Sequence, residues 1–161
     1  MEKTNAVRTL EKFKVPCRAL EYAADKNSPP SGTEVAAQLG LDPTTVFKTL
    51  VTEGKSLAHY VFVIPVGAEL DLKKAAAAVG EKSVAMLPQK KLLPLTGYVH
   101  GGCSPIGMKK PFVTVVDRSA EGKDKIFFSA GKIGMQVEVC PADLPRALAF
   151  TYADVVHDNN A

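Results

Sequence analysis

Two strand-like segments joined by a short turn constrain the fold of this chain more than any other feature. Residues 46–52 (VFKTLVT) alternate in polarity, and residues 57–66 (LAHYVFVIPV) are rich in β-branched and aromatic side chains. The EGKS tetrapeptide between them is a plausible hairpin connection. We therefore expect an antiparallel hairpin at the centre of a sheet.

Helices are predicted on both sides of this hairpin. Apolar residues recur at helical spacing from Ala6 to Phe13, Ser31 with Glu34 has the spacing of a capping box, and Asp71 is the predicted cap of LKKAAAAV. An N-cap residue followed by proline predicts a short helical turn as well. The predicted helices span residues 6–13, 31–39 and 72–79, and the turn spans residues 42–45.

Further short strands alternate with turns rich in glycine, proline and serine. They are predicted at residues 17–22, 83–87, 97–101, 112–117, 125–129 and 135–139, with a final helix at 141–150. The helices are too few and too irregularly placed for a doubly wound sheet. We therefore expect an α+β fold with a mixed, barrel-like sheet flanked by several helices, and a single domain over residues 1–161.

The composition is that of an ordinary globular domain, with 46% hydrophobic and 23% charged residues. Cys17, Cys103 and Cys140 form no CxxC pair, and three scattered histidines offer no metal-ligand spacing, so we expect neither a metal nor a cofactor. The first residues lack the apolar core of a signal peptide, and no apolar run approaches membrane-spanning length. We expect a soluble, cytoplasmic protein without membrane contact.

Lysines gather in pairs, although the net charge of +3 is too small to identify a nucleic-acid-binding protein. Local patches matter more than totals for contacts with phosphates. The pairs either contact phosphates or form an ordinary solvated surface. They are Lys73 with Lys74, Lys90 with Lys91, and Lys109 with Lys110.

Lys48 is the first candidate for a functional side chain. It lies in the first strand of the hairpin on the same face as Val46 and Leu50, because side chains alternate along a strand. A lysine in that position either protects an edge strand from aggregation or lies in a pocket as a partly desolvated cation. The position alone leaves both interpretations open.

Two glycine-rich segments are candidate ligand loops. GGCSPIG at residues 101–107 can expose backbone N–H groups to a ligand, or it is simply a tight irregular turn. FSAGKIG at residues 128–134 is typical of a hairpin turn that can face the same cleft. Tyr22, at the end of the first predicted strand, is either a pocket wall or a core tyrosine.

Cys103 is a candidate nucleophile, with His100 as its candidate general base. Residues three apart on an extended chain point to opposite faces, and no third group orients the pair. Buried structural cysteines are also far commoner than reactive ones. We therefore do not expect Cys103 to be catalytic.

Taken together, these motifs resemble the YbaK/EbsC family of free-standing cysteinyl-tRNA(Pro) deacylases, which is related to the editing domain of bacterial prolyl-tRNA synthetases. VFKTL, GGCSPIG and FSAGKIG occur in the order and approximate spacing of the family, and the resemblance spans almost the whole chain. It implies that Lys48 is the residue most closely tied to activity. It also implies a substrate cleft formed by Tyr22, Thr49, Gly101, Gly102, Ser104, Pro105, Gly107, Ser129 and Gly131.

The resemblance implies hydrolysis of the ester that joins a wrongly attached amino acid to tRNA, assisted by the substrate itself. Its partners would be aminoacylated tRNA and, beyond that, prolyl-tRNA synthetase. Cysteine-specific relatives carry an aromatic residue where this chain has Ser31 and an acidic residue near Gln136, so alanyl or seryl esters are alternative substrates. A non-catalytic module that binds tRNA or a synthetase is the alternative from another class.

Overall fold

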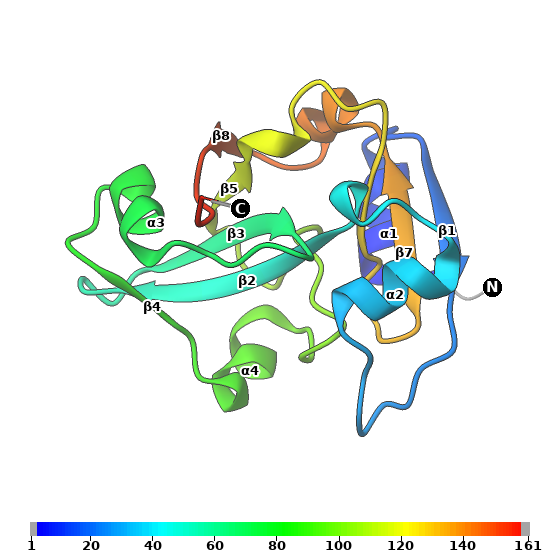
Figure 1. Cartoon of the computed structure of the whole chain (residues 1–161), viewed down its shortest axis with the longest axis horizontal. Coiled ribbons are helices and arrows are strands. Elements are labelled where there is room, and N and C mark those ends of the chain that lie inside the picture. Colours follow the sequence, from blue (N-terminus) through cyan, green and yellow to red (C-terminus); the bar gives the residue numbers. More distant parts are fainter. Residues whose placement is uncertain (1–2, 159–161) are drawn as a thin grey trace.

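A computed structural model describes residues 3–158, so the two ends of the expected domain, residues 1–2 and 159–161, lie outside the described part. Two sheets with helices packed around them form the molecule (Figure 1). The α-helices are α1 (Asn5–Lys12), α2 (Gly32–Leu39), α3 (Leu72–Val79) and α4 (Leu92–Thr96). The strands are β1 (Cys17–Glu21), β2 (Phe47–Gly54), β3 (His59–Pro65), β4 (Val84–Met86), β5 (Val113–Asp117), β6 (Ile126–Ser129), β7 (Met135–Val139) and β8 (Thr151–Ala153).

The predicted hairpin is at the centre of the larger sheet. Strands β2 and β3 pair antiparallel, with Phe47 opposite Pro65 and Glu53 opposite His59. The sheet has the order β4-β2-β3-β5-β8, in which β3 with β5 and β5 with β8 are parallel while the other pairs are antiparallel. The expectation of a mixed sheet with a central hairpin is therefore confirmed.

The second sheet is antiparallel and has the order β1-β7-β6. An isolated bridge between Val46 and Phe127 connects the two sheets just before β2 begins. The α+β class is confirmed, but the described strands divide between two sheets and do not close into a barrel. The first residues of β2, Lys48 among them, consequently lie at the junction of the two sheets.

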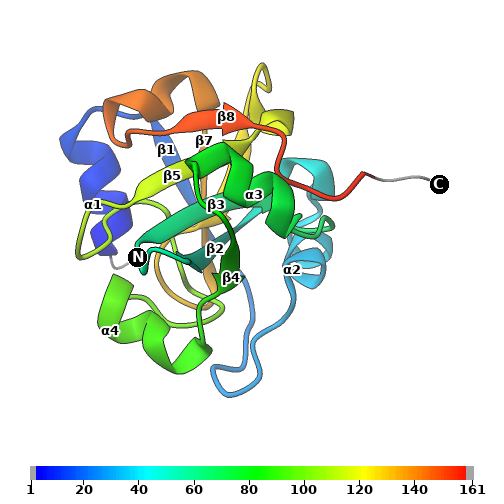
Figure 2. The same ribbon diagram turned by 90° about the vertical axis from the view of Figure 1, so that its left-hand side faces the viewer.

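The helices cover the sheets from several sides (Figure 2). Ala75 and Ala76 of α3 pack on one face of the larger sheet against Phe62, and Leu10 of α1 belongs to the cluster that contains Phe128 of β6. The predicted helix starts are confirmed in detail. Ser31 accepts a hydrogen bond from the Glu34 N–H in a complete capping box, and Asp71 caps α3.

Residues 97–101 form no strand, contrary to expectation. Gly97 and Gly101 both have a φ of 87°, in the left-handed region, and such a backbone turns the chain instead of extending it. The predicted final helix is a six-residue 3₁₀ helix, η4 (Pro141–Arg146), interrupted by Pro145. Three shorter 3₁₀ helices are η1 (Pro43–Thr45), η2 (Gln89–Lys91) and η3 (Arg118–Ala120).

Candidate functional site

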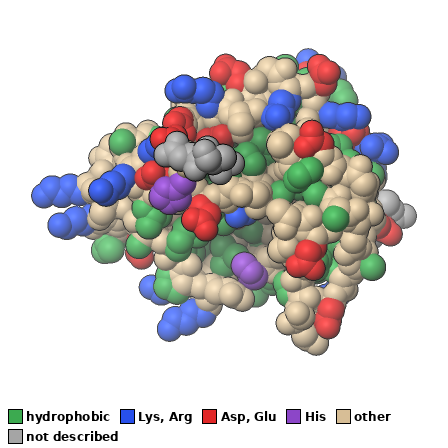
Figure 3. Space-filling view, in the orientation of Figure 1, with side chains coloured by type: hydrophobic (Ala, Val, Ile, Leu, Met, Phe, Trp, Pro, Cys, Tyr) green, Lys and Arg blue, Asp and Glu red, His purple; other side chains and the backbone are tan. Residues whose placement is uncertain are grey.

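A cavity of about 330 Å³ lies where the two sheets meet. Figure 3 shows a hollow in this face of the molecule, with the β2–β3 hairpin on one side, α2 on the other and α4 below. Half of the residues that the sequence nominates for substrate contact line this cavity. They are Tyr22, Lys48, Thr49, Gly101 and Ser129, and they come from four segments that are distant in the chain.

Lys48 is the cation of this cavity. It lies opposite Ile64 of β3, and β4 pairs with β2 only from Thr52 onward, so the cavity opens beside an unpaired stretch of β2. Val46 and Leu50 line the same cavity, but so do Phe47 and Thr49, so the lining does not follow the strand alternation that the sequence predicts. Burial lowers the pKa of the Lys48 ammonium below the ordinary lysine value, while the Glu69 carboxylate acts in the opposite direction.

Two buried oxygen atoms in the lining have no hydrogen-bond partner among the described residues. They are Oγ1 of Thr49, next to Lys48 in β2, and Oε1 of Gln136 in β7, whose side chain is 6% exposed. An unsatisfied buried polar group costs about 1–3 kcal/mol, and native proteins keep few of them. A polar ligand in the cavity would offer both atoms a partner.

The two glycine-rich segments pack against each other beside the cavity. A Cβ atom on Gly102 would lie 2.8 Å from the backbone nitrogen of Ile133 and 2.9 Å from the carbonyl carbon of Lys132. Gly101 lines the cavity in the left-handed conformation. A side chain at position 102 would therefore push apart the two loops that hold Gly101 and Ser129 in place.

The remaining nominated residues lie outside the cavity lining. They are Gly102, Ser104, Pro105, Gly107 and Gly131. Ser104 is completely buried, and its hydroxyl oxygen accepts a hydrogen bond from the N–H of Ile106, while the N–H of Gly131 donates to Oγ of Ser129. These contacts shape the loops, so the structure supports a scaffolding role for this group.

The buried side chain of Tyr98 leaves no room for side chains at two of these positions, Gly107 and Gly131. Its hydroxyl donates a hydrogen bond of 2.6 Å to the carbonyl oxygen of Ile106. A Cβ atom on Gly131 would lie 2.9 Å from the Tyr98 ring, and one on Gly107 would lie 3.0 Å from the Tyr98 hydroxyl. Both glycines thus leave room for a buried tyrosine.

Sequence reasoning missed part of the lining. Leu92 lines the cavity from α4, a helix that the sequence did not predict because Pro94 lies within it. That proline is in the first turn, where its missing N–H has no intrahelical partner to lose. Ser31 and Gln136, the two positions that depart from cysteine-specific relatives, also line the cavity.

The family model for the aminoacyl-tRNA editing domain matches residues 30–147. The chain belongs to this family. EbsC of Enterococcus faecalis, whose name describes it as a candidate Cys-tRNA(Pro)/Cys-tRNA(Cys) deacylase, is 49% identical over 154 residues, which are 96% of this chain and 93% of EbsC. The YbaK/EbsC resemblance of the sequence is thereby confirmed. The matched part of the editing domain contains the cavity residues Lys48, Thr49, Gly101 and Ser129, and Tyr22 precedes it.

Solved structures share the fold of this editing domain. A candidate trans-editing enzyme for prolyl-tRNA synthetase superposes with a TM-score of 0.82 at 22% identity, covering 98% of this chain and all of that one. A protein described only as hypothetical superposes with a TM-score of 0.83 at 24% identity, covering 96% of this chain and all of that one. At this level of identity the likeness concerns the fold.

Cys103 lines the cavity, but its thiol is not poised to react. It is 9% exposed, and burial raises its pKa to about 12, while the side chain of Thr96 acts in the opposite direction. The thiolate that a nucleophile requires is therefore scarce near neutral pH. This geometry agrees with the sequence argument against a catalytic Cys103.

We expect Cys103→Ala to remain folded and to deacylate its substrate at a rate close to that of the wild type, because a thiol with a raised pKa cannot serve as the nucleophile. The measurement is single-turnover hydrolysis of an aminoacyl-tRNA by both proteins, before and after treatment with a thiol-alkylating reagent. A loss of activity of about two orders of magnitude in Cys103→Ala, with the fold intact, would restore the thiol as a nucleophile.

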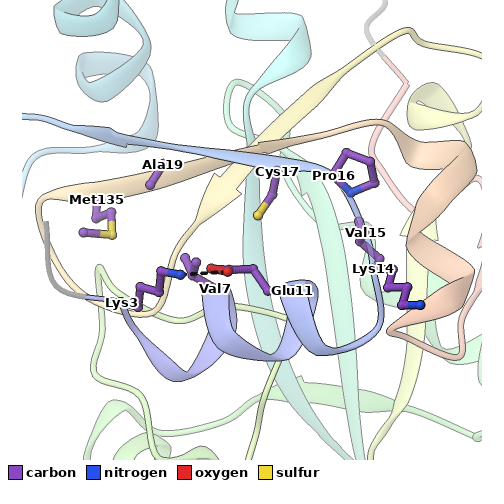
Figure 4. Close-up of a pocket in the computed structure, with 9 residues that line it drawn as sticks. All are labelled: Lys3, Val7, Glu11, Lys14, Val15, Pro16, Cys17, Ala19 and Met135. Carbon is purple, nitrogen blue, oxygen red and sulfur yellow. Dashed lines mark hydrogen bonds and ion pairs between the residues drawn. The ribbon is translucent and has the colours of Figure 1, made fainter.

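A larger cavity of about 630 Å³ lies between α1 and β1 (Figure 4). Its lining is mainly apolar, with Cys17 inside it and an ion pair of 2.8 Å between Lys3 and Glu11 across it. It contains none of the residues that the sequence nominates for substrate contact. The candidate site of the editing domain is therefore the smaller cavity around Lys48.

Metal-binding clusters and membrane spans are both absent from the part of the chain that the structure describes. Within residues 3–158 no three His, Cys, Asp or Glu side chains are grouped so that they could hold a metal ion. No helix in that range is long and apolar enough to span a membrane.

Proposed function

We propose that this editing domain hydrolyses the aminoacyl ester of a misacylated tRNA in the cavity around Lys48, with cysteinyl-tRNA(Pro) as its preferred substrate. The observation that carries the proposal is a half-buried lysine in a cavity whose lining also holds two unpartnered buried oxygen atoms. The name of the related EbsC supports the choice of substrate. We place the reaction in the cytoplasm, with prolyl-tRNA synthetase as a protein that supplies the tRNA.

In this proposal Lys48 stabilises the negative charge that develops on the ester carbonyl oxygen during the reaction. Attack on the ester carbonyl turns its oxygen into an oxyanion, and a positioned cation in a partly dehydrated cavity stabilises that charge. A single donor of this kind contributes about 3–4 kcal/mol in well-studied hydrolases. Gly101 permits the left-handed backbone at this wall of the cavity, where a Cβ atom would lie 3.0 Å from Cβ of Pro29.

The nucleophile comes from the substrate in this proposal. The thiol of an esterified cysteine loses its proton and attacks its own carbonyl carbon. A C–S bond forms, the ester C–O bond breaks, and the ribose oxygen leaves and takes up a proton. The products are a cyclic thiolactone and tRNA with a free terminal hydroxyl. A thiol pKa of about 8.5 leaves a useful fraction of thiolate near neutral pH.

The two unpartnered oxygen atoms would hold the amino acid. Oε1 of Gln136 is an acceptor and suits the α-ammonium group, while Oγ1 of Thr49 can donate to or accept from the ester. A cavity of about 330 Å³ is within the usual range for small-ligand sites. The neutral amide of Gln136 makes binding of the ammonium group weaker than a carboxylate would.

The identity of the amino acid is tested with cysteinyl, alanyl and seryl esters on one tRNA. We expect the cysteinyl ester to be hydrolysed at least about tenfold faster than the seryl ester, with thiolactone as its first product, because a hydroxyl is a much poorer nucleophile than a thiol near neutral pH. Equal rates on all three esters would contradict thiol assistance and favour attack by water aided by the neighbouring ribose hydroxyl. No turnover of any ester would favour a non-catalytic module.

A further inference from the structure

Four exposed lysines precede or follow helix α4 in the chain, and α4 contributes Leu92 to the lining of the cavity. Lys90 and Lys91 belong to η2, which directly precedes α4, while Lys109 and Lys110 follow the 101–107 loop. None of the four forms an ion pair with another residue in the range 3–158. In Figure 3 some of the Lys and Arg side chains lie at the lower edge of the molecule, near the place where Figure 1 shows α4. We call these four residues the basic rim.

Backbone contacts hold the basic rim against the cavity. The N–H of Leu87 donates a 3.0 Å hydrogen bond to the carbonyl oxygen of Val51, three residues beyond Lys48 in β2. Three residues of a strand span about 10 Å, and η2 begins two residues after Leu87, so this hydrogen bond attaches the chain to β2 just before η2. Leu92, the first residue of α4, lines the cavity itself.

The two halves of the basic rim are tied together across α4. The N–H of Lys109 donates to the carbonyl oxygen of Thr96 at 3.0 Å, and its ammonium group lies 3.5 Å from the carbonyl oxygen of Pro94. Lys109 therefore closes the C-terminal end of the helix that Lys90 and Lys91 precede. Lys90, Lys91 and Lys109 thus flank one five-residue helix, and Lys110 is the next residue in the chain.

A groove of about 510 Å³ runs beside this helix. Lys90 and Lys91 line it together with apolar side chains such as Leu95. One acidic residue, Glu53, also lines the groove, and its carboxylate faces the His59 imidazole at 3.7 Å. The charge along this edge is therefore mainly positive and suits an anionic chain.

Lys74, in the remaining lysine pair, is arranged differently. The Lys74 ammonium is held by Asp154 at 3.0 Å, by Asp158 at 2.9 Å and by the carbonyl oxygen of Val156 at 2.8 Å. These contacts attach the C-terminal segment to α3, and they engage all three N–H donors of the Lys74 ammonium group. The Lys74 ammonium therefore serves the fold, whereas the ammonium groups of Lys90, Lys91 and Lys110 form no ion pair or hydrogen bond with another residue in the range 3–158.

We propose that the basic rim binds the phosphate backbone of the acceptor arm of tRNA, so that the aminoacylated end enters the cavity past Leu92. This inference rests on the proposed function for the position of the ester and adds the surface that binds the nucleic acid. Each phosphate that a lysine neutralises releases counterions that had condensed on the tRNA. Because a higher salt concentration makes this release less favourable, the affinity of the basic rim for tRNA should fall as salt rises.

The test compares the binding of uncharged tRNA to the wild type and to the triple variant Lys90→Gln, Lys91→Gln, Lys110→Gln over a range of salt concentrations. Lys109 is left in place because it contacts α4. We expect the Kd to rise about tenfold at low salt, and the slope of log affinity against log salt to become shallower by about one for each phosphate that the variant no longer neutralises. The matched control removes three lysines elsewhere: Lys12→Gln, Lys55→Gln, Lys123→Gln.

Equal salt slopes for the wild type and the rim variant would overturn the inference, as would an equal loss of affinity in the control variant. Weak, salt-independent binding of tRNA by the wild type would overturn it too. Hydrolysis of an aminoacyl ester on a single adenosine by the wild type is measured separately, because that substrate lacks the phosphate backbone. If this ester is stable while the rim variant loses RNA affinity, the proposed function fails and the binding surface stands.

Discussion

Lys48→Ala is expected to fold like the wild type and to lose deacylation activity by at least about two orders of magnitude. Removal of one group that stabilises an oxyanion costs about 10²–10³ in rate in well-studied hydrolases. Lys48 is half-buried in the cavity and forms no ion pair with the residues in the range 3–158, so the loss should concern the reaction and spare the fold. The measurement is single-turnover hydrolysis of cysteinyl-tRNA(Pro), with circular dichroism as the check on folding.

Two companion measurements separate the charge of Lys48 from its bulk. Lys48→Met keeps most of the length without the charge and should be as inactive as Lys48→Ala. Lys48→Arg keeps the charge but brings a larger, planar group into a cavity of about 330 Å³, so partial activity is expected. Activity of Lys48→Met equal to that of the wild type would exclude an electrostatic role for the lysine.

The lowered pKa of Lys48 gives this prediction a pH dependence. Burial disfavours the ammonium form, so Lys48 loses its proton at a pH below the ordinary lysine pKa. Activity that depends on the cation should fall as the pH rises through that lowered pKa.

The same pKa shift also affects stability. Because the folded state disfavours the ammonium form, protonation of Lys48 lowers the free energy of unfolding at neutral pH. Lys48→Met should therefore be at least as stable as the wild type.

Gly102→Ala is expected to destabilise the fold by about 1–3 kcal/mol and to reduce activity as well, because overpacking of this kind forces backbone shifts. The added methyl group would meet backbone atoms of Lys132 and Ile133 at 2.8–3.0 Å, and backbone atoms cannot rotate away as a side chain can. The displaced loops carry Gly101 and Ser129 of the cavity. Urea denaturation gives the free energy of unfolding of both proteins.

Gly67→Ala is the matched control for that experiment. A Cβ atom at Gly67 would have no heavy atom within 4 Å, and neither Gly67 nor Gly102 has a positive φ, so the two substitutions differ in steric contact rather than in backbone strain. Gly67→Ala should leave both stability and activity nearly unchanged. If Gly102→Ala is equally harmless, the two glycine-rich loops are not packed as tightly as the structure indicates.

Local signals in the sequence predicted the elements whose ends are chemically marked. The capping box at Ser31 and Glu34 and the Asp71 cap depend on neighbouring residues alone, and the structure confirms both of them. The pairing of β2 with β3 was predictable for the same reason, because a short turn leaves a hairpin few other registers.

Features that depend on contacts between distant segments could not be predicted from the sequence. The way the two sheets meet depends on the Val46–Phe127 bridge, which joins residues about 80 positions apart. The cavity role of Leu92 depends on a helix that contains a proline, and the role of Gly102 depends on the backbone of residues 132 and 133. Of the predicted ligand loop at residues 101–107, only Gly101 and Cys103 line the cavity.

One measurement tests the central claim directly: the time course of ester loss from cysteinyl-tRNA(Pro) with the purified wild-type chain, with Lys48→Ala and without protein. The cavity around Lys48 predicts rapid release by the wild type, with thiolactone as the first product, and a rate for Lys48→Ala at least about two orders of magnitude lower. Ester loss in the presence of the wild type that is no faster than without protein, or equal rates for the wild type and Lys48→Ala, would contradict the account.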